Sequence, residues 1–322
     1  MRIAAIALLL LALPQFAHAQ SPALIAGKPV RIVVPSAGGG NPDVLARMLA
    51  PRLQATWGTP IVVDNQPGAG GISAAISISK SAPDGHLLFF GSNAALSIAA
   101  AMNPKLPYDP LKDFTLITAL ASVPTVLVVN PSVPANNLQE FIAYAKTRPG
   151  QLNFGSAGVA SIHHLTLAVF EVESGTKFLH IPYKGGSPLV AAVMAGEVQA
   201  GFSGIPNVVQ AIRAGKMKVF GLSVPDRSKS MPDVPTIDEL GVKGFNVATT
   251  IGLQTSVGLH RNLVTLFQQS FAKYLRDAEI ADRMANLGMV LMENGTDNYL
   301  QFMKDEAVRY AAAVKAAGIK FE

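Results

Sequence analysis

The chain has 322 residues, of which 49% are hydrophobic and 15% charged, and it contains no cysteine. This length predicts two domains of about 150 residues each, and the low charged fraction excludes a disordered protein. The formal net charge is +5, but Lys and Arg form no run, which argues against a nucleic-acid partner. Without cysteine, the chain has no disulfide, thiolate zinc site or thiol nucleophile.

Residues 1–19 have the pattern of an export signal. Arg2 supplies a positive start, Ile3 to Leu13 is an apolar run, and Ala17-His18-Ala19 matches the small-x-small pattern of a cleavage site. An apolar run of eleven residues spans about 16 Å as a helix, against about 30 Å for the hydrocarbon core of a membrane. We therefore expect a Sec-type signal peptide that is cleaved after Ala19 and directs the mature protein to the periplasm.

The next segments alternate between short apolar strands and longer helical periods. Strands are expected at 31–34, 61–63 and 87–90, with glycine-rich turns at 35–40 and 68–71. Asn41 is expected to cap a helix that has Pro42 in its first turn, and a second helix is expected over 72–81. Ser92 and Asn93 are expected to cap another helix.

The same alternation continues to the end of the chain. Strands are expected at 126–129, 152–154, 178–181, 198–202 and 219–223, and helices at 138–146, 161–174, 262–276 and 298–317. Apolar strands flanked by helices predict an α/β fold with mostly parallel sheets. Residues 121–124 and the proline-containing loop 224–236 are expected to cross between domains.

Two glycine-rich turns, 35–43 and 155–161, each join a strand to a helix. Such turns place free backbone N–H groups at the positive end of a helix, where they can hold an anion. Ser156 and Ser161 add hydroxyl donors. The alternative is a tight connection that binds nothing, and the turns by themselves leave both interpretations open.

Other signatures of chemistry are incomplete. A dinucleotide fingerprint would need glycine at 43 and 73, where the chain has Asp43 and Ser73, and there is no P-loop. A nucleophile elbow would need glycine in place of Ile205. His163 and His164 are adjacent and lack the spacing of a zinc pair, so we expect one packed histidine and one exposed. The sequence predicts no catalytic residue, metal or cofactor.

Several longer motifs occur together in one order. They are Val34-Pro35 with Gly39-Gly40, Val63-Asp64-Asn65-Gln66-Pro67-Gly68, Ala82-Pro83-Asp84-Gly85, Leu106-Pro107-Tyr108-Asp109-Pro110, Gly155-Ser156-Ala157-Gly158 with Ser161 and His164, His180-Ile181-Pro182-Tyr183-Lys184-Gly185, and Pro232-Asp233-Val234-Pro235-Thr236. In these motifs the chain resembles the extracytoplasmic solute receptors of tripartite tricarboxylate transporter systems, the Bug receptors. The resemblance covers nearly the whole mature chain.

The resemblance implies a two-lobed periplasmic binding protein fold of type II-like topology, with the ligand cleft between the lobes. Lobe 1 would comprise 20–121 and 224–322, and lobe 2 would comprise 122–223. Receptors of this kind hold a ligand carboxylate with backbone amides, hydroxyls and water. The expected ligand-binding residues are Ser36, Ala37, Gly38, Gly39, Gly40, Asn41, Asp43, Ser92, Asn93, Ser156, Ala157, Gly158, Val159, Ser161, His164 and Ser203.

Some positions depart from the family pattern. Ser36 and Ala37 replace an aromatic residue and a proline, and Ala160 replaces a glycine. Ser203 stands where an aspartate is common, and that aspartate can face a ligand amino group. The serine therefore argues against amino-acid ligands, and mono-, di- and tricarboxylates, aromatic ones included, remain open.

The resemblance also implies a function and partners. The expected protein is a monomeric receptor that delivers a small organic acid to the membrane permease subunits of a tripartite tricarboxylate system, with no nucleic acid involved. One alternative is a periplasmic sensor that serves a two-component kinase. Another is an exported α/β hydrolase, against which the absence of a catalytic triad argues.

Overall fold

The computed structural model describes residues 24–318 except 26, 37, 40, 68–70, 160, 184 and 293–294. The expected signal peptide lies outside the described residues. In the described part, no helix has both the length and the hydropathy that a membrane span requires.

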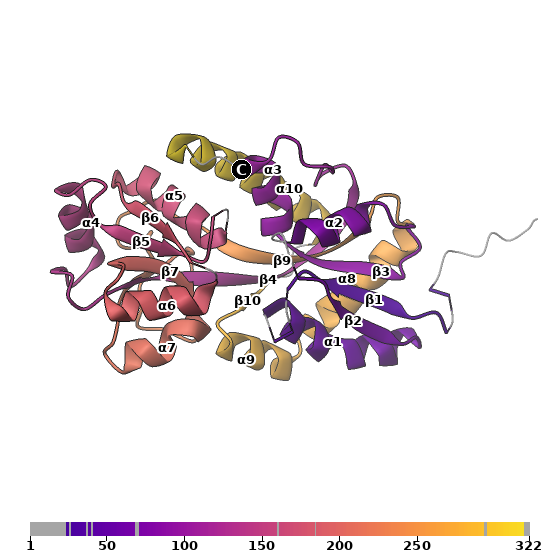
Figure 1. The fold of residues 1–322 in the computed structure, drawn as a ribbon. Helices are drawn as coiled ribbons and strands as arrows, with labels where there is room; N and C mark the ends of the chain where they lie inside the picture. Colours follow the sequence, from indigo (N-terminus) through magenta and orange to yellow (C-terminus); the bar gives the residue numbers. More distant parts are fainter. Residues whose placement is uncertain are drawn as a thin grey trace, which may run out of the picture.

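Two α/β lobes are joined by two long strands (Figure 1). The first lobe contains the parallel strands β1 (Val30–Val34), β2 (Ile61–Asn65) and β3 (Leu87–Ser92). The second contains the parallel strands β5 (Asn153–Ser156), β6 (Leu179–Pro182) and β7 (Ala200–Gly204), together with β8 (Lys218–Leu222). The crossing strands are β4 (Phe114–Val129) and β9 (Ala248–Ser256), and β10 (Val290–Leu291) pairs with β4.

The sheet is continuous, with the strand order β2-β1-β3-β9-β4-β7-β5-β6. Its outer thirds are parallel, as the alternating pattern predicts, and the two central strands run antiparallel to their neighbours. This arrangement is the mixed, curled sheet of a two-lobed binding protein.

Helices cover both faces of the sheet (Figure 1). In chain order they are α1 (Asn41–Trp57), α2 (Ile72–Ser79), the π-helical turn η2 (Ala94–Ile98), α3 (Ala99–Met102), α4 (Leu138–Lys146), α5 (Ile162–Ser174), α6 (Gly186–Ala195), α7 (Ile205–Arg213), α8 (Arg261–Leu275), α9 (Ala278–Asn286) and α10 (Gly295–Ala317). Helix α10 packs against η2 and α3 in the first lobe and against α5 in the second.

The connection between the lobes depends on β4. Its residues up to Pro124 pair with β9, and from Thr125 onward they pair with β7 and β8. Pro124, which has no N–H to donate, stands at the change of partners. The expected crossing at 121–124 lies at this point. The sequence predicted a strand only over 126–129, because Thr, Ser and Pro interrupt the apolar pattern before it.

Strand β9 was not predicted at all, since its polar residues hide a strand pattern. Thr250, Gln254 and Thr255 are buried, and hydrogen bonds satisfy them in part. The Thr255 hydroxyl donates to the Leu87 carbonyl at 2.7 Å, and the Tyr299 hydroxyl donates to Gln254 Oε1 at 3.1 Å. These polar residues can therefore be buried in a strand because the tertiary structure supplies their hydrogen-bond partners.

The segment 224–247 differs from the expected boundary. Val224, Met231 and Val234 pack into one core cluster with Val190 and Val208 of the second lobe. The chain therefore stays with the second lobe after Val224 and returns to the first at Ala248, where β9 begins. The second crossing is therefore set by tertiary packing against the second lobe. The composition of this irregular segment does not indicate that packing.

Candidate functional site

Strand register brings polar residues of both lobes to the junction. Ser92, at the carboxyl end of β3, pairs with Ile251 of β9. Ser203 of β7 pairs with Val126 of β4, next to the change of partners. Parallel pairing places Ser36, after β1, near the end of β3, and Ser156 of β5 near the end of β7. The carboxyl ends of strands in open α/β sheets are where ligands bind.

Asp43 organises the first loop through hydrogen bonds within the protein. Its side chain is 4% exposed and accepts hydrogen bonds from the Gly39 amide at 2.8 Å, Arg47 Nε at 2.9 Å and Asn65 Nδ2 at 2.9 Å. Burial raises the pKa of this carboxyl, but the bonds from Arg47, Gly39 and Asn65 outweigh it and lower the pKa below its ordinary value.

The remaining residues of the first loop are more open. Gly38 and Gly39 are exposed, and Gly39 has φ +83°, which favours glycine. Asn41, expected as an N-cap, is the first residue of α1. Ala37 and Gly40 lie outside the described residues. The Gly39 N–H was expected to face a ligand, but it already donates a hydrogen bond to the Asp43 carboxylate. A ligand would have to compete with Asp43 for this donor.

The second loop is held by neutral hydrogen bonds. The Ser156 hydroxyl donates to the Gly158 carbonyl at 3.0 Å and lies 2.6 Å from His180 Nε2. The Ser161 hydroxyl donates to the same carbonyl at 2.7 Å and caps α5 by accepting the His164 amide at 3.3 Å. Gly158 has φ +129°, and Val159 is exposed. Ala157 is half-buried.

Three histidines surround this loop. The His164 ring stacks on the His180 ring at 3.8 Å, and both rings are half-buried. Burial, and secondarily His180, lowers the pKa of His164 to about 4, and burial lowers the pKa of His163 to about 4. The expectation of one packed and one exposed histidine is therefore wrong, since both are half-buried on the first turns of α5. They are neutral at pH 7.

Two hydroxyls at the junction have no hydrogen-bond partner within the described structure. They are Ser36 Oγ of the first lobe and Ser203 Oγ of the second, and both atoms are buried. Buried polar atoms normally find a partner. Asn93 Oδ1 is a third buried atom of the predicted site residues that has no partner within the described structure.

Asn93 has a different role from the expected helix cap. It precedes η2 in an αR conformation and makes no side-chain cap. Its Nδ2 instead donates to the Ala248 carbonyl at 2.8 Å, to Glu306 Oε1 at 2.9 Å and to Tyr310 Oη at 3.2 Å. Asn93 thus ties the end of β3 to β9 and α10, while Ser92 ends the strand as a buried residue.

Glu306 was not singled out from the sequence. It is 4% exposed and also accepts hydrogen bonds from Ser97 at 3.1 Å and Tyr310 at 2.9 Å. Burial raises the pKa of Glu306 to about 7, against the effect of these bonds. The signal was present, because Phe302, Glu306 and Tyr310 recur every four residues and so share one helix face.

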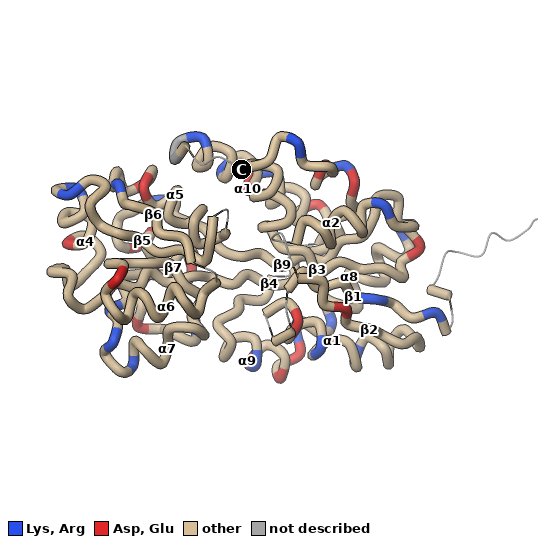
Figure 2. Tube along the Cα trace, viewed as in Figure 1, with Lys and Arg blue, Asp and Glu red and all other residues tan. Residues whose placement is uncertain are grey.

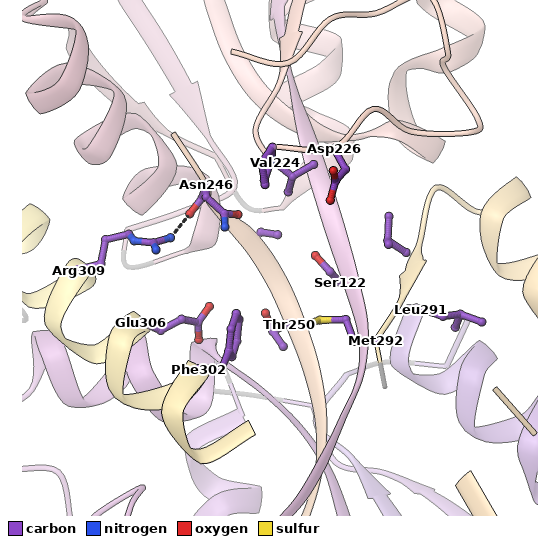
Figure 3. A pocket seen from close by; sticks show the side chains of 13 residues that line it. Ser122, Val224, Asp226, Asn246, Thr250, Leu291, Met292, Phe302, Glu306 and Arg309 are labelled. Atoms are coloured by element: carbon purple, nitrogen blue, oxygen red, sulfur yellow. Dashed lines mark hydrogen bonds between the residues drawn. The ribbon is translucent and has the colours of Figure 1, made fainter. Parts of the chain in front are cut away.

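A cavity of about 310 Å³ lies at the lobe junction beside Glu306 (Figure 3). Ser122 and Thr250 of the crossing strands line it, with Val224 and Asn246 from the second-lobe segment. None of the predicted ligand-binding residues that the structure describes lines this cavity.

Charged residues lie mainly along the outer rims of both lobes, with the two signs interspersed (Figure 2). In the described parts of the chain, no group of three or more His, Asp or Glu side chains is arranged to hold a metal ion.

Comparison with known proteins agrees with this arrangement. Residues 45–319 match the model of the tripartite tricarboxylate transporter family receptor. The chain belongs to this receptor family. BugT of Bordetella pertussis is 33% identical over 92% of this chain and 91% of its own length. Relatives of this kind are solute receptors, and family members are periplasmic.

Two similar solved structures contain ligands. MatC of Rhodopseudomonas palustris, with bound malate, is 31% identical with a TM-score of 0.75, covering 89% of this chain and 98% of that chain. An adipate-bound protein of R. palustris is 27% identical with a TM-score of 0.76, covering 91% and 98%. The fold and the family expected from the sequence motifs are confirmed.

Proposed function

We propose that this receptor binds a small organic carboxylate between the loops 36–43 and 156–161 and delivers it to the permease of a tripartite tricarboxylate system. The observation that carries the proposal is the pair of buried hydroxyls, Ser36 Oγ and Ser203 Oγ, which lack protein partners and come from opposite lobes. The malate and adipate complexes of similar receptors support a carboxylate. Export by a signal peptide at 1–19 and a monomeric receptor are part of the same proposal.

The positive end of α5 supplies the electrostatic attraction. A helix N-terminus favours an anion by its aligned dipoles and free N–H groups, without a formal charge. Asp43 is already matched by Arg47, so the first loop brings no unpaired negative charge towards the ligand. The neutral histidines beside the second loop keep it uncharged at pH 7. Hydroxyls, amides and water therefore hold the ligand.

The Ser156–His180 pair favours a second candidate, a hydrolase. At 2.6 Å the two atoms are close enough for a base to activate a nucleophile. Ser156 is completely buried, however, and its hydroxyl donates to the Gly158 carbonyl. Among the described residues, no carboxylate hydrogen-bonds to the His180 ring. We propose that the pair shapes the loop and that the protein is not an enzyme.

Closure of the lobes accompanies binding in this proposal. The hinges are the change of partners at Pro124–Thr125 and the return of the chain at 247–248. Small-angle scattering with and without saturating ligand should show a smaller radius of gyration in the bound state. An unchanged radius would indicate a rigid, preformed pocket.

The direct test is a thermal-shift screen of the mature protein against mono-, di- and tricarboxylates. A ligand at 100 times its Kd adds about 2.7 kcal/mol to the free energy of unfolding, which raises Tm by several degrees. If no carboxylate raises Tm while sugars or metal ions do, the proposal is wrong. Turnover of a carboxylic ester that depends on Ser156 would instead support the hydrolase.

A further inference from the structure

The cavity at the lobe junction combines three features that suit a cation. It is lined by a buried carboxylate, Glu306, by an aromatic ring, Phe302, and by a second carboxylate, Asp226. Phe302 and Glu306 lie one helical turn apart on α10 and so face the same way. Figure 3 shows both side chains directed from α10 towards the crossing strands.

Glu306 is negatively charged above its pKa but receives only neutral donors. Asn93 and Tyr310 donate to Oε1, and Ser97 donates to Oε2. A carboxylate has about four acceptor positions, so three donors leave one position unused. When this carboxyl is ionised, a cation at the unused position would pair its buried charge.

The neighbouring cation does not fill this role directly. Arg309 also lines the cavity, but its Nη1 donates to the Asn246 carbonyl at 2.5 Å. Arg309 therefore lies at the Asn246 side of the cavity, as Figure 3 shows. Of the groups that lower the pKa of Glu306, Arg309 has the smallest effect.

The remaining walls fit the body of an organic molecule. Leu291 and Met292 of the β10 region, together with Val224, give the cavity apolar surface. An aromatic face next to a carboxylate is an arrangement that attracts an ammonium group, by the ring quadrupole and by charge. About 310 Å³ is at the lower end of the range for small-molecule sites.

We propose that this cavity is a second binding site, for a small organic ammonium ion with an apolar body. The ammonium group would donate to Glu306 and face Phe302, and the apolar body would lie against Leu291 and Met292. Because the walls come from both lobes, an occupant contacts both. The site is separate from the two proposed carboxylate-binding loops, since none of their described residues lines it.

The test uses cyclohexylmethylamine, which is protonated at pH 8.5, in calorimetric titration of the mature protein without any carboxylate. Glu306 is ionised at this pH. We expect saturable binding that Glu306→Gln weakens at least tenfold. The matched control is Asp305→Asn. This change removes one negative charge from the exposed residue of α10 that directly precedes Glu306, and it should leave binding unchanged. Circular dichroism melts confirm that each variant folds.

Neutral and anionic probes separate the alternatives. Cyclohexylmethanol should bind at least tenfold more weakly than the amine, and ¹³C-methyl NMR should show the Met292 signal shifting, as assigned with Met292→Leu. Equal binding of the alcohol and the amine would show that the cavity recognises only the apolar body. Tighter binding of cyclohexanecarboxylate than of the amine would show that Arg309, not Glu306, recognises the charged group. Either result, or unchanged amine binding by Glu306→Gln, overturns the proposal. Because no carboxylate ligand is present in the amine titration, its outcome does not depend on the proposed function.

Discussion

The two loops at the junction are held in place by different physical means. The first loop is fixed by an ionic group, since the buried Asp43 carboxylate gathers the Gly39 amide, Arg47 and Asn65. The second is fixed by neutral groups, the hydroxyls of Ser156 and Ser161 around the Gly158 carbonyl. The first loop thus keeps its charge balanced within itself, and the second has none to balance. In the proposed function, an anion between them would therefore meet dipoles and hydroxyls rather than a salt bridge.

Backbone geometry at Gly158 gives the largest expected effect. Gly158→Val places a branched side chain at φ +129°, with its Cβ 3.4 Å from the Tyr183 carbonyl. We expect local strain of about 1–3 kcal/mol and an at least tenfold loss of affinity for a carboxylate that raises Tm in the screen. Calorimetric titration measures the binding, and circular dichroism melts measure the stability.

Gly150→Val is the matched control for this change. Gly150 also has positive φ, at +71°, but nothing lies within 4 Å of its added Cβ, and the residue is exposed beyond α4. The Gly150→Val variant should be less stable than the wild-type protein and should bind the carboxylate with unchanged affinity. Equal loss of affinity in both variants would show that general strain in the second lobe, not the loop, controls binding.

Acid should loosen the two loops in different pH ranges. The pKa of His163 is lowered by burial from 6.5 to about 4, so the unfolded state binds more protons between these values. Its contribution to stability is complete above pH 6.5 and is lost as the pH falls towards 4. The lowered pKa of Asp43 adds stability that is complete above 3.8 and lost only below it.

Melts across pH 3 to 8 check this difference. His163→Gln should remove up to about 1.4 kcal/mol per pH unit of slope between pH 6.5 and 4. Asp43→Asn should lower stability at neutral pH and flatten the curve below 4. Slopes that change in the same range for both variants would contradict the assignment.

Two serines should separate structure from binding. Ser161→Ala removes the N-cap of α5 and should cost about 0.5–2 kcal/mol of stability. Ser36→Ala removes a hydroxyl without a protein partner among the described residues, so melts should show little change. Its cost should appear in binding, at about 1.5–3 kcal/mol if the hydroxyl meets a charged carboxylate. A stability loss in Ser36→Ala with unchanged binding would reverse the roles of the two serines.

The sequence predicted the parallel outer strands and the two glycine-rich loops, because apolar runs and strand–turn–helix junctions are local signals. It did not predict β9, whose buried Gln254 and Thr255 find partners only after folding. His180 lies beside Ser156 only because β6 pairs with β5 in one register, with Phe154 opposite His180. A single sequence does not specify that register.

Other contacts could not be predicted because they depend on residues that are distant in the sequence. The hydrogen bond that Asn65, at the carboxyl end of β2, donates to Asp43 was not predicted, and the expected place of Asp43 at the ligand stays a prediction. Asn93 was expected as a cap, but Glu306 of α10 and the Ala248 carbonyl are better placed partners. Tertiary partners override the local preferences of short polar side chains.

The central claim is that neutral donors from both lobes hold the carboxylate. The most direct measurement is calorimetric titration of a carboxylate that raises Tm in the screen into folded wild-type protein and two double variants, Asp43→Asn/Arg47→Gln and Ser36→Ala/Ser203→Ala. The first removes both charges of the ion pair together, so the account predicts that it changes Kd less than threefold, while the second, which loses both hydroxyls without a partner in the described structure, raises Kd at least tenfold. Abolished binding in Asp43→Asn/Arg47→Gln with normal binding in Ser36→Ala/Ser203→Ala would show that a salt bridge holds the ligand.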